Sequence, residues 1–349
     1  MSKTIKNSFN KNLTYEKMLK AYERALKNKA SKKDVLKFNV DLETNLWNII
    51  NELKKGTYKM GKYKTFKIYE PKERLIKSLP FKDRIVQQWY IYEFIKPYFM
   101  KRFIIDTFAC IDNRGTHSAV NRVQEYMRYM QKEYKKYYIL KCDIKGFFYN
   151  IDKNILFKIM LDVIIDRKLL NLTKLFIFDE EEKGIPIGNY TSQYFANIYL
   201  NILDHYVKEK LKIKYYVRYM DDFIIFTDTK EKALNVMKAI KSFLNKKLKL
   251  ELNKKSKYYP NKLGINFCGY IVYETHKLLR KGSKIQIKKR IKVWNKLSNK
   301  NMLNEHRMLL EWNSFMAHAS HANSYKFISK IYNKIDRNDF LKHWYVINL

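Results

Sequence analysis

The stretch Tyr215-Tyr-Val-Arg-Tyr-Met-Asp-Asp-Phe-Ile-Ile-Phe226 places two adjacent aspartates, Asp221 and Asp222, between two runs of strand-forming residues. An Asp pair on its own is typical of a hairpin turn. The apolar residues on both sides predict a position near a sheet core, where two anions are poorly solvated and repel each other. A divalent cation would neutralise the pair. The stretch therefore predicts two strands joined by a turn that carries carboxylates.

A third carboxylate, Asp143, interrupts another apolar run, Leu140-Lys-Cys-Asp-Ile-Lys-Gly-Phe-Phe148. If the two strands lie side by side in one sheet, Asp143 and Asp221 meet at one point. Oxygen ligands from separate strands suit Mg²⁺, which binds few carboxylates and keeps positions for water and phosphate. Two such ions can activate a hydroxyl and stabilise the leaving group in phosphoryl transfer. The carboxylates therefore indicate metal-assisted chemistry on a phosphate.

The chain is strongly basic. Its 349 residues include 71 Lys and Arg against 34 Asp and Glu, which gives a net charge of +37. Coding bias toward Lys and Asn does not by itself deplete Asp and Glu, so a polyanionic partner is the better explanation. Together with the carboxylates, the charge predicts a nucleotidyl transferase that acts on a polynucleotide.

The sequence does not favour a membrane or an oxidising compartment. No stretch approaches the roughly 18 uncharged apolar residues of a membrane span, and the first residues lack the apolar segment of a signal peptide. Cys110, Cys142 and Cys268 are isolated and form neither a disulfide framework nor a zinc motif. We expect a cytoplasmic protein with no membrane partner.

Helical and strand-like segments mix along the chain without regular βαβ alternation. Helices are expected over 13–29, 33–54, 82–99, 116–133, 152–166, 190–209 and 230–247, and again toward the C-terminus. Strands are expected over 137–144, 215–220, 223–227 and 265–273. The predicted class is α+β, with an antiparallel sheet and helices on one face.

The two aspartate motifs resemble the active-site motifs of reverse transcriptases. Other segments resemble further motifs of that family, and all occur in the family's order. They are Pro71-Lys-Glu-Arg-Leu-Ile76, Phe81-Lys-Asp-Arg-Ile-Val86, Asn113-Arg-Gly-Thr-His-Ser-Ala-Val-Asn-Arg122, Gly184-Ile-Pro-Ile-Gly-Asn-Tyr-Thr-Ser-Gln-Tyr-Phe-Ala-Asn197, Leu252-Asn-Lys-Lys-Ser256 and Phe267-Cys-Gly-Tyr270. The resemblance implies a right-hand polymerase with fingers, a palm built on an antiparallel sheet, and a helical thumb.

The same resemblance sets the expected domain boundaries. Residues 1–139 would form an N-terminal extension and the fingers, and residues 140–275 the palm, with 173–210 contributing to the fingers. Residues 276–349 would form the helical thumb.

The loop at Gly184 indicates a subfamily. Common bacterial reverse transcriptases carry Gln-Gly and Ser-Pro where this chain has Ile187-Gly188 and Ser192-Gln193. The pattern resembles reverse transcriptases of diversity-generating retroelements, as do the Arg114-Gly-Thr-His117 segment and the short chain. Antiphage-defence reverse transcriptases share parts of it. Both possibilities stay open at this point.

The resemblance also implies a metal site. Asp143, Asp221 and Asp222 would be catalytic and would hold two Mg²⁺ ions, for which Mn²⁺ can substitute. The backbone carbonyl of Ile144 would be a further ligand. A supporting role in the turn is the alternative for Asp222.

Around the metal site the resemblance implies contacts to nucleotide and nucleic acid. Lys72 and Arg74 would bind the triphosphate, Lys255 would lie near the leaving pyrophosphate, and Phe148 would exclude a 2′-hydroxyl. Ordinary core packing suits Phe147 better than Phe148. The remaining predicted residues are Ile187 and Gly188 for the nucleotide, and Tyr219, Met220, Ser192 and Gln193 for primer and template.

The predicted function is RNA-directed DNA polymerisation, which copies an RNA template into cDNA from deoxynucleotides. In the retroelement reading, synthesis is error-prone at adenines and a small, basic, helical accessory protein is expected. In the defence reading, the template is an associated noncoding RNA. A non-catalytic nucleic-acid-binding module is the alternative of another class, but it does not explain why Asp143, Asp221, Asp222 and Phe148 are all present.

Overall fold

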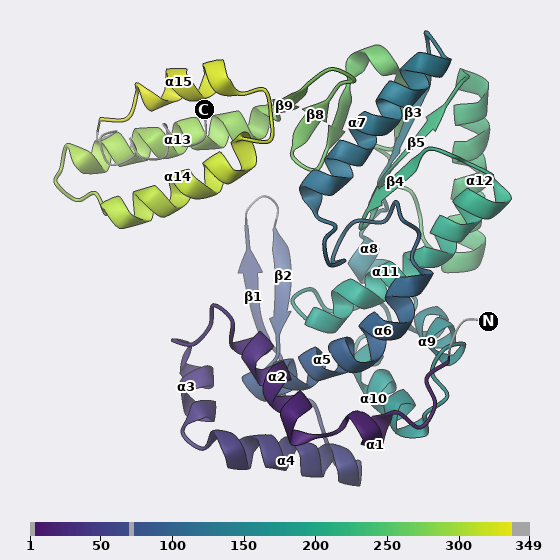
Figure 1. The fold of residues 1–349 in the computed structure, drawn as a ribbon, viewed down its shortest axis with the longest axis vertical. Helices are drawn as coiled ribbons and strands as arrows, with labels where there is room; N and C mark the ends of the chain where they lie inside the picture. Colours follow the sequence, from purple (N-terminus) through teal and green to yellow (C-terminus); the bar gives the residue numbers. More distant parts are fainter. Residues whose placement is uncertain (1–3, 70–72, 337–349) are drawn as a thin grey trace.

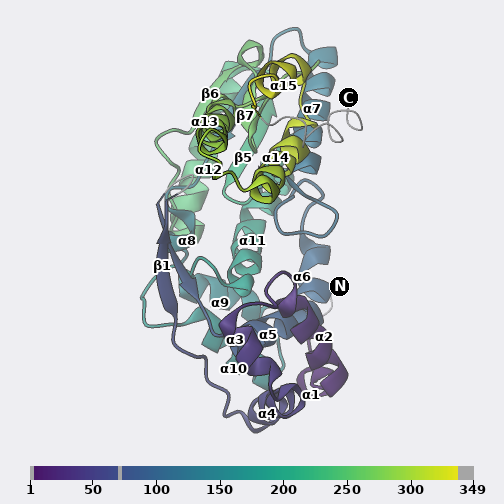
Figure 2. The ribbon, with the colours of Figure 1, turned by 90° about the vertical axis from the view of Figure 1, so that its left-hand side faces the viewer.

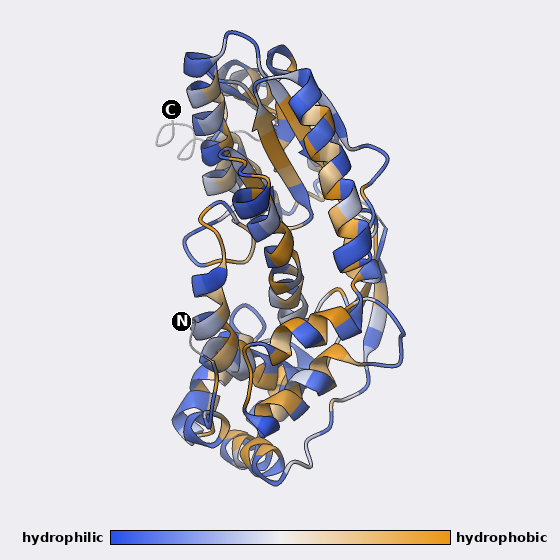
Figure 3. Ribbon diagram, turned by 90° about the vertical axis from the view of Figure 1, so that its right-hand side faces the viewer, coloured by the Kyte–Doolittle hydropathy of each residue, from blue (hydrophilic) through white to orange (hydrophobic). Residues whose placement is uncertain are grey.

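The computed structural model describes residues 4–69 and 73–336. A group of N-terminal helices lies at one end of the long axis, an antiparallel sheet lies at the other, and the C-terminal helices stand to one side (Figure 1). Helix α11, Tyr190–His205, runs between the two ends (Figure 2). The strands of the sheet are hydrophobic, whereas the outer helices carry many hydrophilic residues (Figure 3). The predicted α+β class is confirmed.

The N-terminal region is built from short helices. The helix expected over 33–54 is instead two, because the chain breaks after Asn39. The Asn39 side chain accepts a hydrogen bond from the Tyr22 hydroxyl at 2.9 Å, and the Asn45 side chain donates to the Phe38 carbonyl at 3.0 Å. Such side-chain bonds replace those of a continuous helix. The elements are α1 (Phe9–Asn12), α2 (Tyr15–Leu26), α3 (Lys33–Asn39), α4 (Leu42–Lys55), α5 (Phe81–Tyr90), a π-helix (Ile91–Ile95), α6 (Lys96–Phe99) and a 3₁₀ turn (Met100–Arg102).

An antiparallel hairpin separates α4 from α5. Its strands are β1 (Lys64–Ile68) and β2 (Arg74–Ser78), and Thr65 pairs with Lys77. The hairpin projects from the N-terminal helices toward the C-terminal ones (Figure 1).

The central sheet has the strand order β4-β5-β3-β6, and all its pairs are antiparallel. Its strands are β3 (Tyr138–Cys142), β4 (Tyr216–Tyr219), β5 (Asp222–Thr227) and β6 (Lys257–Pro260). Leu140 and Ile225 pack into the core shared with α11 and α12, and Ile139 and Ile224 pack into a second core with α7. The prediction of helices on one face is therefore wrong. The strands are apolar at successive positions, and such strands are covered on both faces.

Seven helical segments cover this sheet or connect it to the N-terminal region. The helix expected over 152–166 ends at Leu161, and a second helix begins after Asp166. Asp152 and Asp166 cap the two helices by accepting hydrogen bonds from the backbone NH of Ile155 and Leu169 at 3.0 and 3.2 Å. The segments are α7 (Thr116–Glu133), α8 (Phe147–Asn150), α9 (Lys153–Leu161), α10 (Arg167–Ile177), α11, a π-helix (Tyr206–Lys210) and α12 (Lys230–Leu248).

A small three-stranded sheet leads into the C-terminal helices. The strand expected over 265–273 is a hairpin, because Cys268 and Gly269 adopt positive φ angles of 45° and 93° and reverse the chain. The elements are a 3₁₀ turn (Asn261–Leu263), β7 (Ile265–Phe267), β8 (Tyr270–Val272), β9 (Lys277–Leu279), α13 (Lys281–Ser298), α14 (Glu305–Ala319) and α15 (Tyr325–Tyr332).

Two further predictions can be compared with the fold. No helix in the described part of the chain has the length and apolar character needed to cross a bilayer. Cys110, Cys142 and Cys268 are all free thiols.

Candidate active site

A cavity of about 750 Å³ lies where the central sheet meets α8, α11 and the β2 strand. Asp143, Asp221 and Asp222 all line it, so the structure brings the three predicted carboxylates together. The other predicted residues on its wall are Arg74, Ile144, Phe148, Ile187, Gly188, Ser192, Gln193, Tyr219 and Met220. Residues that lie more than 140 positions apart in the sequence therefore line the same cavity.

Strand pairing places the carboxylates. Cys142 of β3 pairs with Phe223 of β5, so the residues that flank this pair, Asp143 and Asp222, lie at the same end of adjacent strands. Tyr219 pairs with Asp222 across the β4–β5 turn. Met220 in this turn has a φ of 54°, a left-handed conformation that closes the reversal tightly. The turn therefore presents two successive carboxylates beside a third.

The Leu252–Ser256 segment holds Asp143. The Asn253 side chain donates to Asp143 Oδ2 at 2.9 Å, and the Asn253 amide donates to the Asp143 carbonyl at 2.7 Å. Ser256 Oγ accepts from the Asp143 amide at 3.1 Å. These contacts explain why this predicted motif accompanies the aspartate strands.

Asp222 is the carboxylate whose electrostatics are most perturbed. Burial raises its pKa to about 6, the nearby Lys141 ammonium opposes the shift, and the charges of Asp143 and Asp221 add to it. Lys141 Nζ lies 3.2 Å from Asp222 Oδ2. The other oxygen, Oδ1, is buried and has no hydrogen-bond partner among the described residues. An unpaired buried carboxylate oxygen beside two further carboxylates fits a cation.

The donor set is one that Mg²⁺ prefers. Within residues 4–69 and 73–336, no three His, Cys, Asp or Glu side chains are arranged to hold an ion on their own. Mg²⁺ does not require such a cage, since it keeps waters and substrate oxygens among its ligands. An isolated antiparallel β-bridge pairs Ile144 with Leu252. Its hydrogen bonds are made by the Asp143 carbonyl and the Lys145 amide, so the Ile144 carbonyl takes no part in them.

The two phenylalanines after Asp143 differ in environment. Both line the cavity, but Phe147 is 2% exposed and packs in the core, whereas Phe148 is partly exposed. The Phe148 carbonyl accepts a hydrogen bond from the Ile185 amide at 2.8 Å. A Cβ on Gly184 would lie 2.9 Å from the same carbonyl, so this glycine permits the close contact.

Ile187 and Gly188 lie against strand β2. The Lys77 amide donates to the Ile187 carbonyl at 2.9 Å. Gly188 has a φ of 118°, and a Cβ there would be 2.7 Å from the Lys77 carbonyl, so no other residue fits without displacement. This contact keeps Arg74, on the same strand, at the cavity wall. Lys72 lies outside the described residues.

The predicted primer and template residues also line the cavity. Ser192 is buried near the start of α11, and the Gln193 amide oxygen accepts from the Cys110 thiol at 3.3 Å. The Tyr219 hydroxyl lies 3.2 Å from that of Thr116, the first residue of α7.

Among the predicted site residues that the structure describes, Lys255 is the one that does not line this cavity. It lines a neighbouring cavity of about 290 Å³ together with Lys141 and Lys257. Several cavity residues were not predicted as site residues, among them Thr116, Asn253 and Arg280. All three belong to or adjoin segments with family-like motifs or basic runs, but the sequence does not show that their side chains face one space.

Residues 54–272 match the reverse transcriptase (RNA-dependent DNA polymerase) family. None of the curated proteins matches the chain. Among solved structures, the chain is similar to an apo telomerase from Candida tropicalis truncated from its C-terminal domain, with 15% identity, a TM-score of 0.46, and coverage of 66% of this chain and 59% of that one.

A telomerase from Candida albicans, in complex with a TWJ fragment of telomeric RNA, shows 12% identity and a TM-score of 0.46, and the alignment covers 83% of this chain and 63% of that one. The chain thus spans about three fifths of the length of these structures. The family match extends over most of the chain and includes every carboxylate of the cavity. The chain belongs to the reverse transcriptase family.

Proposed function

We propose that this protein is an RNA-directed DNA polymerase that uses two divalent metal ions. The observation that carries the proposal is the convergence of Asp143, Asp221 and Asp222 on one cavity whose wall also includes Arg74 and Phe148. Carboxylates, a guanidinium and a bulky ring are the groups needed for a metal-bound deoxynucleotide.

Asp143, Asp221 and Asp222 would hold the Mg²⁺ ions, with the Ile144 carbonyl as a further ligand, and Mn²⁺ accepts the same oxygen donors. When bound, the ions would polarise the α-phosphate and stabilise the primer 3′ oxygen. The chain's own part is to hold these oxygens rigidly, since Asn253 and Ser256 fix Asp143 and strand pairing fixes the turn.

Arg74 would bind the triphosphate, together with Lys72, and Phe148 would lie beneath the sugar. The guanidinium can form paired hydrogen bonds with phosphate oxygens. Lys255 would act near the leaving pyrophosphate only if the chain moves, because it lines the neighbouring cavity.

The three-part division of a right-hand polymerase is also a proposal. Residues 1–139 would form an N-terminal extension and the fingers, 140–275 the palm, with 173–210 contributing to the fingers, and 276–349 the helical thumb. The cavity is bounded by Glu73 and Arg74 of the hairpin and by Arg280 just before α13, which supports nucleic acid passing between these elements.

A diversity-generating retroelement is the proposed setting. Its support is the Ile187-Gly188 and Ser192-Gln193 pattern, and all four residues lie on the cavity wall. Template RNA, a cDNA primer and deoxynucleotides would be the substrates, and a small basic helical protein a partner. A template and variable repeat pair beside the gene would support this setting, and a phage-responsive noncoding RNA there would favour the defence role.

Primer extension tests the proposed activity. Purified protein is given an RNA template, a DNA primer and Mg²⁺, with deoxynucleotides in one reaction and ribonucleotides in the other. We expect extension with deoxynucleotides only. Tight binding of the duplex without extension in Mg²⁺ or Mn²⁺ would instead indicate a non-catalytic binding module.

A further inference from the structure

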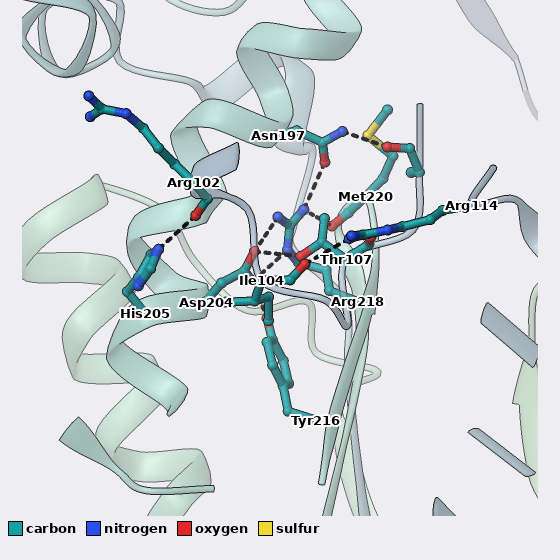
Figure 4. Close-up of polar contacts among 11 residues, drawn as sticks. Arg102, Ile104, Thr107, Arg114, Asn197, Asp204, His205, Tyr216, Arg218 and Met220 are labelled. Carbon is teal, nitrogen blue, oxygen red and sulfur yellow. Dashed lines mark hydrogen bonds and ion pairs between the residues drawn. The ribbon is translucent and has the colours of Figure 1, made fainter. Parts of the chain in front are cut away.

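A buried arginine lies directly beneath the turn that carries Asp221 and Asp222. Arg218 is on β4, three residues before Asp221, and its side chain is 0% exposed. Its guanidinium lies among side chains and carbonyls from α11, from the segment before α7 and from the turn itself (Figure 4).

One side of the guanidinium pairs with Asp204 of α11. Nε donates to Asp204 Oδ1 at 2.7 Å and Nη2 donates to Oδ2 at 2.5 Å. Tyr216 also donates to Oδ1, at 2.7 Å, and Thr107 donates to Oδ2, at 2.8 Å. The carboxylate is therefore fully occupied, and the bidentate pair fixes the plane of the guanidinium.

The remaining nitrogen, Nη1, contacts the turn. It donates to the Met220 carbonyl at 3.0 Å and to the Asn197 side-chain oxygen at 3.0 Å. The Asn197 amide group in turn donates to the Ala109 carbonyl at 2.7 Å. The Arg218 guanidinium thus links the turn to α11 and to the 104–109 segment.

The carbonyl that Arg218 holds belongs to the residue with the strained backbone. Met220 has a positive φ of 54°, which is uncommon for a residue with a Cβ. A side-chain donor that binds its carbonyl stabilises this conformation. Because Asp221 follows immediately, a rotation of the 220–221 peptide would turn the first carboxylate away from Asp143.

Stability alone gives little reason for this arrangement. A buried ion pair is often no more stable than apolar residues of similar volume, because both charges lose their hydration. The guanidinium does what an apolar residue cannot, since it spans a carboxylate, an amide and a backbone carbonyl in one plane.

We propose that Arg218 is a positioning residue for the metal-binding carboxylates, acting through the Met220 carbonyl. This inference rests on the proposed polymerase function. Its specific content is that the bond from Nη1 to Met220, rather than the ion pair with Asp204, sets the orientation of Asp221.

The test compares three variants. In Arg218→Met with Asp204→Leu, both charges are removed together, so no unpaired charge is left in the core. In Arg218→Lys, the charge facing Asp204 is kept, but a lysine cannot also reach Asn197 and Met220 in the same fork. Tyr216→Phe is the matched control, because it removes a hydrogen bond to the same Asp204 oxygen without changing the turn.

Four measurements are made: kcat and KM for a deoxynucleotide, the affinity for Mn²⁺ by electron paramagnetic resonance without nucleotide, the affinity for the primer–template duplex, and the midpoint of urea unfolding. For both Arg218 variants we expect kcat to fall by about 10²-fold, as for a misplacement of about 1 Å. Mn²⁺ affinity should fall by about tenfold, and duplex affinity should not change. Tyr216→Phe should lower the unfolding midpoint and keep the Mn²⁺ affinity of the parent.

Two results would overturn the inference. One is Mn²⁺ affinity and kcat within twofold of the parent in both Arg218 variants. The other is a loss of Mn²⁺ affinity and kcat that is proportional to the fall in the urea unfolding midpoint in all three variants. A purely structural role predicts that result. Because Mn²⁺ binding is read without catalysis, failure of the parent to extend a primer would count against the polymerase proposal and leave this comparison meaningful.

Discussion

Phe147 and Phe148 stand edge to face with ring centroids 5.5 Å apart, yet only one of them belongs to the core. Phe147 is packed among buried residues, and it supports the ring of Phe148 at the cavity wall. A ring held from behind in this way can exclude a substrate atom by shape, because it cannot easily move aside.

Phe148→Ala should admit ribonucleotides. Removing the ring opens space for a 2′-hydroxyl while the metal-binding carboxylates stay in place. We expect the ratio of ribonucleotide to deoxynucleotide incorporation to rise by roughly tenfold or more, as for other small steric changes in a pocket. The measurement is single-nucleotide incorporation of each ribonucleotide against its deoxynucleotide.

Phe147→Leu is the matched control for this substitution. It should lower the free energy of unfolding, because a core ring is lost, and it should change the sugar preference much less than Phe148→Ala does, because the Phe148 ring stays at the cavity wall. An unchanged ratio in active Phe148→Ala would assign Phe148 to packing alone.

Ile187→Gln should lower misincorporation opposite template adenine by several-fold. An amide can form a hydrogen bond beside the nascent base pair, whereas isoleucine offers only shape and apolar contact. One such bond contributes about 0.5–1.5 kcal/mol, which corresponds to a factor of roughly two to thirteen. Sequencing of cDNA made by both proteins on one adenine-containing RNA gives the error rates.

The parent protein supplies the control for Ile187. Faithful copying of adenine by the parent would favour the defence role over the retroelement. An error-prone parent with an equally error-prone variant would remove Ile187 from the explanation and leave Gln193 or a partner protein as the source of error.

Binding of RNA should weaken steeply with salt. The net charge of +37 provides many cations for phosphate contacts. If about six phosphates are neutralised, a plot of the logarithm of affinity against the logarithm of salt concentration should have a slope of roughly −4 to −5. Fluorescence anisotropy over a salt series measures it. A slope near zero would show that the excess charge stays solvated and reflects coding bias.

The contact of α7 with α14 and with the turn that follows α14 should weaken in acid. The His117 and His321 rings stack with centroids 3.6 Å apart, and His318 Nδ1 lies 2.9 Å from the Tyr270 hydroxyl. Burial lowers the pKa of His117 and of His318, and neighbouring cations, Lys277 and Arg280 among them, add to the shifts. Since the folded state disfavours the protonated rings, their contribution is intact above the ordinary histidine pKa near 6.5 and is lost as the pH falls below it.

Thermal unfolding at pH 7.5 and pH 5.5 measures this dependence. The double substitution His117→Gln and His318→Gln should reduce the difference between the two midpoints. His205 provides an opposite control: burial opposes protonation there, but hydrogen bonds with Glu209 and the Arg102 carbonyl outweigh it and raise its pKa. His205→Gln should therefore enlarge the acid loss. An identical pH difference in the parent and the double variant would contradict this assignment.

The sequence predicted which carboxylates would lie together better than it predicted the layers around them. Asp143, Asp221 and Asp222 were recognisable because charged residues interrupt apolar strands, and a charge in such a position needs a chemical reason. The covering of both sheet faces was missed, although Ile224 and Ile225 are consecutive apolar residues that point to opposite sides.

Other features depend on contacts between distant segments. Strand β6, Lys257–Pro260, is short and ends in a proline, so it is recognisable as a strand mainly through its pairing with Lys141 and its neighbours on β3. Arg218 is visible in the sequence as a charge in a strand. Its pairing with Asp204, fourteen residues earlier, depends on how α11 crosses the sheet.

The most direct test of the central claim is primer extension on an RNA template by Asp221→Asn, with Asp162→Asn as the matched control. Asp162 is an exposed carboxylate at the end of α9, away from the cavity. Asp221→Asn removes a metal ligand at nearly constant shape, so deoxynucleotide addition in Mg²⁺ should fall by about a thousandfold or more, equivalent to several kcal/mol. Its unfolding midpoint and RNA affinity should match those of the parent, and Asp162→Asn should extend normally. Normal extension by Asp221→Asn would contradict the metal-dependent mechanism.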